Sequence, residues 1–270
     1  MRAAFPGFPR EGIDFFRALA RHNTREWFLP RKSDFETLVK QPMRELVEAL
    51  NATLARFAPE HITSPDGAIY RFYRDTRFSP DKTPYKDRIA ANFPRHGLAR
   101  HDGAGYYFSV SHKEVAVGGG LYLATPDALA AVRRHLVSRH EEFRRICRAA
   151  GLRRLLGEVQ GDRLVRTPKG FPADHPAAGL LQFKQLYFYV ELPPEIATTP
   201  SLYGEIARRF RAMAPFTDFL NEPLIALRKT VAASGFFTDP RRGDVGRLQV
   251  KPRRRSHLSE TATRTDQPLN

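Results

Sequence analysis

The change of hydrophobic period between residues 57 and 69 is the feature that most constrains how this chain can fold. Over residues 33–57, apolar side chains recur every three or four positions, which is the period of one buried helix face. Pro42 lies inside this stretch and is expected to kink the helix or split it, because proline lacks a backbone N–H. Residues 69–74 instead alternate as a strand does. The two periods together favour a fold that combines helices with a sheet.

The remaining segments predict the same mixture. Gly118-Gly119-Gly120 is expected to end the strand before it, and it has two interpretations: a bulge or a close approach of neighbouring backbone, or a wall where a ligand comes near backbone N–H groups. Helices around an antiparallel sheet predict an α+β fold, with a mostly antiparallel sheet flanked by helices. Strands are expected at 88–93, 106–111, 114–117, 164–165 and 183–192, and further helices at 11–22, 202–213 and 216–231. Another helix is expected to begin at Pro126 and to break near Ser138, and a second helix to follow it to Ala150, with Gly151 as its stop.

Length and composition predict one domain with a basic tail. The chain has 270 residues, of which 41% are hydrophobic, which is ordinary for a globular protein. We expect a single compact α+β domain over residues 5–240. Residues 241–270 are expected to form a flexible basic C-terminal tail, because apolar residues are sparse there and little burial can offset the ordering entropy.

The net charge of +15 favours anionic partners such as nucleic acid, phosphates or acidic surfaces. A bias in the base composition of the coding sequence that favours arginine over lysine would also raise the charge, without any binding role.

The sequence contains no apolar run long enough for a membrane span and no secretory h-region, so we expect a cytoplasmic protein without a membrane partner. Cys147 is the single cysteine, which excludes an intrachain disulfide and a four-cysteine zinc site. The histidine spacings predict no metal, and no motif predicts a cofactor.

The stretch "RFYRDTRFSPDKTPYKDR", residues 71–88, concentrates charge in a short segment that we call the arch. Six of its eighteen residues are basic and three are acidic. Pro80 and Pro84 restrict its backbone and hold the charges near one another. At about 6 Å and an effective dielectric near 20, each uncompensated pair of like charges costs on the order of 2–3 kcal/mol. Three cations exceed what the arch aspartates neutralise, so carboxylates from elsewhere or a bound anion must compensate them.

The leading hypothesis is that the arch binds a small phosphate- or carboxylate-bearing ligand, with chemistry on that ligand left open. Arginine suits bidentate capture of such groups, whereas lysine acts as a point charge. If the protein is an enzyme, Tyr85 or Asp75 is the candidate for proton transfer. Two alternatives stay open: a nucleic-acid-binding module that uses the arch and the tail, and a structural or interaction domain whose arch is an ion-pair network. The ligand-binding candidates are Arg71, Arg74, Arg77, Lys82, Tyr85 and Lys86.

Four stretches carry a resemblance to a known family. They are "NTREWF" at 23–28, "YRDTRFSPDKTPYK" at 73–86, "VGGGLY" at 117–122 and "PKGFPADHP" at 168–176. The sequence resembles an uncharacterised family of bacterial conserved hypothetical proteins, known as domain of unknown function 2461, over roughly residues 5–235. The resemblance implies a single compact domain and directs attention to the arch. It implies no reaction.

Overall fold

A four-stranded antiparallel sheet forms the centre of the computed structural model, which describes residues 5–77, 80–98 and 102–233. The strands follow one another in chain order across the sheet, and each pairs antiparallel with the next. The expected α+β fold is therefore confirmed. The strands are β1 (Arg88–Phe93), β2 (Gly105–Ser111), β3 (Val115–Leu121) and β4 (Leu186–Leu192).

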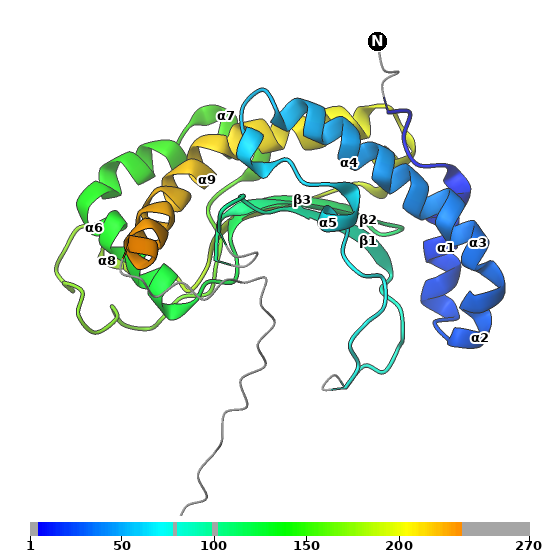
Figure 1. The fold of residues 1–270 in the computed structure, drawn as a ribbon, viewed down its shortest axis with the longest axis horizontal. Helices are drawn as coiled ribbons and strands as arrows, with labels where there is room; N and C mark the ends of the chain where they lie inside the picture. Colours follow the sequence, from blue (N-terminus) through cyan, green and yellow to red (C-terminus); the bar gives the residue numbers. More distant parts are fainter. Residues whose placement is uncertain (1–4, 78–79, 99–101, 234–270) are drawn as a thin grey trace, which may run out of the picture.

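Helices cover one face of this sheet, as Figure 1 shows for α4 and α9. Several of the elements are connected by shorter 3₁₀ turns. These turns are η1 (Leu29–Arg31), η3 (Pro59–His61) and η4 (Pro194–Thr198). The α-helices are α1 (Arg10–Arg21), α2 (Arg25–Phe28), α3 (Lys32–Phe35), α4 (Gln41–Leu54), α5 (Pro65–Ala68), α6 (Pro126–Cys147), α7 (Ala150–Leu156), α8 (Ala178–Leu181) and α9 (Ser201–Ala233).

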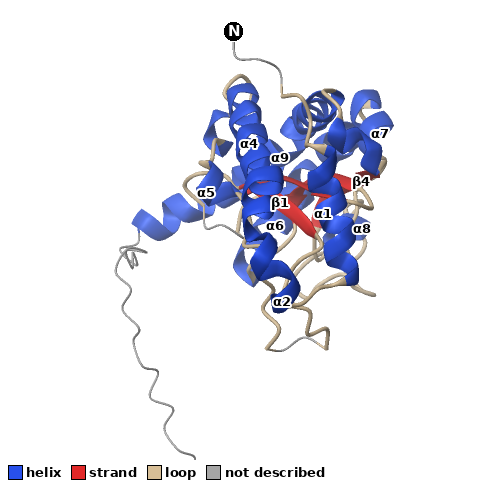
Figure 2. Cartoon of the chain, turned by 90° about the vertical axis from the view of Figure 1, so that its right-hand side faces the viewer, coloured by secondary structure: helices blue, strands red, loops and turns tan. Residues whose placement is uncertain are grey.

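The alternation of side chains gives the sheet two unlike faces. Tyr106 and Phe108 of β2 are fully buried toward α9, and their ring centroids lie 5.0 and 6.5 Å from that of Phe210. The Tyr106 hydroxyl lies 2.9 Å from Oγ1 of Thr217, which satisfies it inside this apolar layer. Tyr107 is on the opposite face, toward which the loops gather in Figure 2. That opposite face is only partly covered and carries the site described below.

The long helix expected over residues 33–57 is confirmed, with a local change of winding at Pro42. Between α3 and α4 lies a π-helical turn, η2 (Glu36–Lys40), and Pro42 occupies the first turn of α4. A π turn shifts the hydrogen-bond pattern by one residue, so the helix passes the proline without a break in its buried face.

The expected break between helices at 202–213 and 216–231 is wrong, because α9 runs through both Pro215 and Pro223. A proline inside a helix costs about 3 kcal/mol. Phe210, Met213 and Phe216 on either side of the first proline are all fully or nearly fully buried. Burying such side chains contributes about 1.5–3 kcal/mol each, which outweighs the proline and holds both halves against the sheet.

The glycine run does not end its strand, because β3 continues through all three glycines to Leu121. A Cβ at Gly119 would lie 2.8 Å from the carbonyl oxygen of Gly105 and 3.1 Å from Sδ of Met213. Gly120 has a φ of +129°. The glycines thus allow the close approach of neighbouring backbone and of α9, which the sequence left as one of two interpretations.

Other local expectations also needed correction. Residues 69–74 and 164–165 form no regular strand; isolated bridges join Ile69 to Ala91 and Tyr73 to Tyr85. Gly151 lies inside α7 rather than stopping a helix, whereas the break expected near Ser138 is found as non-helical backbone at Arg139 inside α6. The strands expected at 88–93 and 106–111 are confirmed, and the strand expected over 183–192 is β4, which begins at Leu186. Within the described ranges, no helix has the length and apolarity to cross a membrane. The expected tail at 241–270 lies outside the described residues.

Candidate functional site

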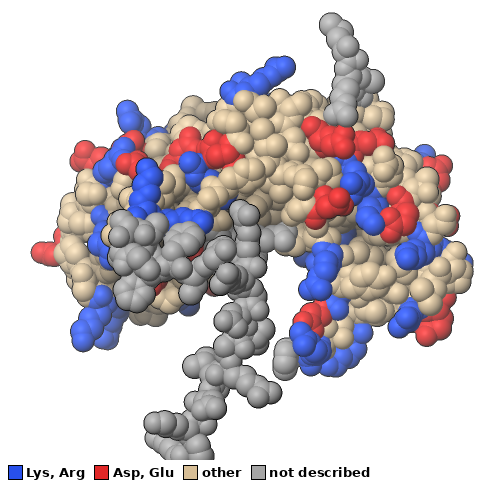
Figure 3. All heavy atoms as spheres, viewed as in Figure 1, with Lys and Arg blue, Asp and Glu red and all other residues tan. Residues whose placement is uncertain are grey.

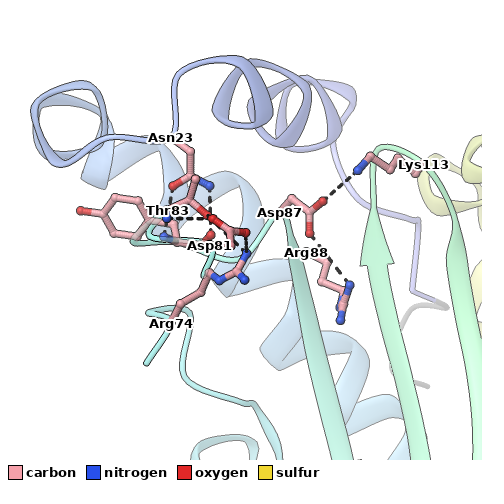
Figure 4. A network of polar contacts seen from close by, with 8 residues as sticks. Asn23, Arg74, Asp81, Thr83, Asp87, Arg88 and Lys113 are labelled. Carbon is pink, nitrogen blue, oxygen red and sulfur yellow. Dashed lines mark hydrogen bonds and ion pairs between the residues drawn. The ribbon is translucent and has the colours of Figure 1, made fainter. Parts of the chain in front are cut away.

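One asparagine fastens the arch to the body of the protein. Nδ2 of Asn23 donates a hydrogen bond of 2.9 Å to the carbonyl oxygen of Tyr85, and the Tyr85 N–H donates one of 3.1 Å to Oδ1 of Asn23 (Figure 4). Asn51 makes the same pair of bonds to the backbone of Thr63. A side-chain amide matches a peptide group in both donor and acceptor, so Asn23 pairs with the Tyr85 backbone as a neighbouring strand would.

Tyr85 lies in the aromatic core beneath this attachment. Its ring stacks on Phe28 at a centroid distance of 4.2 Å and lies 5.6 Å from Phe72, and the residue is 2% exposed. Burial, and next the neighbouring Tyr73, raise the pKa of Tyr85, which favours its neutral form. The structure therefore places this candidate for ligand binding and proton transfer at the anchor of the arch rather than on an accessible surface.

Three arch cations are turned toward partners within the arch. Arg74 lies 2.7 Å from Asp81, and Arg77 forms hydrogen bonds of 3.0 and 2.8 Å to Asp75. Lys82 donates to the carbonyl oxygen of Thr76 at 2.9 Å. The convergence of the arch cations on one site, which the sequence led us to expect, is therefore not found for these three. Their contacts match the ion-pair network that was one of the alternatives.

Asp75 is also unsuited to accept a proton near neutral pH. The hydrogen bonds from the Arg77 side chain and then from its backbone N–H lower the pKa of Asp75 to about 2. The Arg77 side chain is 76% exposed, so solvent screens this ion pair. The pair shapes the tip of the arch and keeps the carboxylate ionised.

Lys86 differs from the other arch cations. Its Nζ lies 5.5 Å from the centre of the Tyr70 ring, and the side chain is half-buried. Burial is the first cause that lowers the pKa of Lys86, followed by the positive charges of Arg88, Arg71 and Arg74. No carboxylate among the described residues forms an ion pair with Lys86. Lys86 is thus a cation whose neighbouring charges are positive, while Arg71 lies exposed close by.

Arg88 completes this cationic group at the start of β1. It lies 3.9 Å from Asp87, whose other carboxylate oxygen accepts a hydrogen bond of 3.0 Å from Lys113 (Figure 4). Burial raises the pKa of Asp87, but Lys113 and Arg88 act against it and the net shift is downward. Because Lys113 already compensates Asp87, the longer Arg88 contact leaves much of the guanidinium charge available to other groups.

A cleft of 540 Å³ opens on the loop side of the sheet, beside the arch. In Figure 3 a hollow lies below the sheet, and Lys and Arg side chains lie along its arch side. The strand register places Asn92, Tyr107, Gly118 and Tyr189 in one row across its floor. Other residues that line the cleft include Tyr70, Arg88, Tyr122 and Leu123.

The phenols of this floor are hydrogen-bond donors rather than charges. Burial, followed by the neighbouring Tyr107, raises the pKa of Tyr189 to about 12. Burial likewise raises the pKa of Tyr187. A Cβ added to Gly118 would meet Cδ2 of Tyr189 at 3.3 Å, so the glycine leaves room for that ring to lie over β3. The floor can therefore offer aromatic faces and hydroxyl groups to a ligand.

The comparison with known families agrees with this fold. A family model described as "Conserved hypothetical protein (DUF2461)" matches residues 11–219. This chain belongs to the DUF2461 family. No curated protein and no solved structure matches it. The DUF2461 match includes the arch, all four strands and most of α9, so the cleft is built from residues of the family region.

The cleft residues of this DUF2461 protein were mostly missed by sequence reasoning. Tyr107, Tyr189 and Asn92 fall on alternate positions of strands that were expected, and alternation alone indicates that each lies on the less buried face. Which of them share a row depends on the strand register. Among the described residues, no three His, Cys, Asp or Glu side chains are grouped so as to hold a metal ion.

Proposed function

We propose that this DUF2461 protein binds a small phosphate- or carboxylate-bearing ligand in the cleft, with the anionic group held by Lys86 and Arg88. The observation that carries the proposal is the half-buried ammonium of Lys86, which lies among positive charges without an ion-pair partner in the described chain. A desolvated cation is stabilised when an anion approaches it, because the interaction is weakly screened there.

The geometry supports two different roles for the cations of the arch, one structural and one in ligand binding. Arg74, Arg77 and Lys82 keep the arch in shape through contacts within it. Arg88 lines the cleft, Lys86 lies over the ring of the lining residue Tyr70, and Arg71 adds positive charge from outside. The volume of 540 Å³ is within the range of about 300–1,000 Å³ that is usual for small-molecule sites. The proposal includes no reaction.

The test is calorimetric titration of the full chain with inorganic phosphate and with phenyl phosphate at 50 mM salt. Arg88→Met should weaken binding at least tenfold. Arg153→Met is the matched control, because Arg153 is about as exposed as Arg88 but pairs with Glu158 and lies outside the cleft lining, and it should bind like wild type. Equal affinity of wild type and Arg88→Met, or no binding of either anion up to 10 mM, would overturn the proposal.

The salt dependence of binding affinity distinguishes a nucleic-acid groove from a site for a small ligand. A groove that contacts about five phosphates loses affinity with a log–log salt slope of about −4 to −5, whereas a site for one phosphate has a shallow slope. Oligonucleotide binding that stays submicromolar at 300 mM salt and depends on Arg88 would replace the small-ligand proposal with the nucleic-acid alternative.

A further inference from the structure

The two ends of the cleft differ in chemistry. Arg88 lines one end with positive charge, and the ammonium of Lys86 lies 5.5 Å from the ring centre of the lining residue Tyr70. The other end is apolar and aromatic: Tyr122 and Leu123 are 61% and 54% exposed, and the Tyr122 ring lies 5.3 Å from that of Tyr187. Large side chains exposed at a cleft mouth favour a ligand that covers them.

The floor between these ends is aromatic. Tyr70, which lies under Lys86, has its ring centroid 6.3 Å from that of Tyr107. Tyr107 and Tyr189 flank Gly118 in one row of the sheet, and adjacent strands are about 4.8 Å apart. Tyr189 leans over the glycine, so the row presents ring surface instead of aliphatic side chains.

The distance between the charge and the aromatic row suits a molecule with two parts. Arg88 precedes Asn92 by four residues on β1, which corresponds to about 13 Å along the strand. A bare phosphate would occupy the cationic end and leave the aromatic floor uncovered.

We infer that the ligand of the cleft carries a planar ring joined by a spacer to its anionic group, as a nucleoside monophosphate or an aryl phosphate does. This inference rests on the proposed function, because the Lys86 and Arg88 end must hold the anion. The ring stacks on the row formed by Tyr107 and Tyr189, and the neutral phenols donate hydrogen bonds to its polar edge. Base–aromatic stacking is tolerant of ring type, so the shared chemistry is the ring and the anion.

The test compares four probes on the full chain: inorganic phosphate, phenyl phosphate, adenosine 5′-monophosphate and adenosine. We expect one or both ring phosphates to bind at least tenfold more tightly than inorganic phosphate. Adenosine should bind at least tenfold more weakly than its monophosphate. A preference for the nucleotide over phenyl phosphate identifies a nucleotide ligand, and the reverse preference an aryl phosphate; both support the inference.

Variants of Tyr189 test whether the ring of the ligand stacks on this side chain. Tyr189→Leu should weaken the ring phosphates about tenfold and leave inorganic phosphate unchanged, whereas Tyr189→Phe keeps the ring face and should stay within threefold of wild type. Tyr73→Ser removes an exposed tyrosine outside the cleft lining and is the control. If Tyr189→Leu does not fold, Tyr122→Ser at the exposed mouth replaces it, with the same expectation.

The two proposals fail in different ways. Inorganic phosphate bound as tightly as both ring phosphates, with no effect of the tyrosine variants, overturns the ring inference and leaves the anion site intact. The proposed function itself is overturned if adenosine binds as tightly as its monophosphate. It is also overturned if the anions bind Arg88→Met and wild type with the same affinity.

Discussion

Replacing Asn23 by alanine should release the arch and lower the free energy of unfolding by about 2 kcal/mol. The side chain makes two hydrogen bonds to the backbone of Tyr85, of 2.9 and 3.1 Å, and each contributes about 1 kcal/mol net. For a domain of this size, that loss corresponds to a melting temperature lower by about 4–8 °C. Urea denaturation measures the global loss, and hydrogen exchange at the Tyr85 amide measures the local one.

Asn51→Ala is the matched control. It removes the same pair of bonds, here to Thr63 at 2.7 and 3.1 Å, and should cost a similar free energy. Asn23→Ala, unlike Asn51→Ala, should speed exchange at Tyr85 and weaken anion binding, because Asn23 is bonded to the residue that precedes Lys86. The reasoning is refuted if Asn23→Ala unfolds at the wild-type urea concentration and the Tyr85 amide exchanges at the wild-type rate.

Four further predictions follow from single positions or segments. Gly119→Ala places a Cβ 2.8 Å from the Gly105 carbonyl oxygen and should cost about 1–3 kcal/mol by urea denaturation; an unchanged midpoint would show that the strands can separate freely there. Burial lowers the pKa of His61 below its ordinary value near 6.5, so the unfolded state binds more protons and stability should fall as pH decreases below about 6.5. His61→Gln should flatten that fall between pH 7.5 and 5.5, and an equally steep profile would assign it to other groups. Burial raises the pKa of Cys147 to about 12, so iodoacetamide should label it slowly at pH 8 until urea unfolds the protein; rapid native labelling would contradict this. Deleting residues 241–270 should change the melting temperature by less than about 5 °C, since apolar residues are sparse there; a larger drop would show that the segment packs on the domain.

Local periodicity was enough to determine most of the elements. The 88–93 strand was expected with the bounds that β1 has, and the buried face of residues 33–57 was expected because helical period depends only on neighbours along the chain. The concentration of charge in residues 71–88 was also visible in the sequence. Where local signals failed, as at Pro215 and Gly118-Gly119-Gly120, burial against the sheet outweighed them.

Only the tertiary structure decided which charges are compensated and what lies beside them. The spacing of the arch residues is the same whether Arg74 faces Asp81 or a ligand; the fold of the arch turned it to Asp81. The row that joins Asn92, Tyr107 and Tyr189 needs three strand pairings, and its first and last residues are 97 positions apart in the sequence. Strand register is fixed by burial of one face of the whole sheet, which is a non-local condition, so the cleft could not be derived from any single segment.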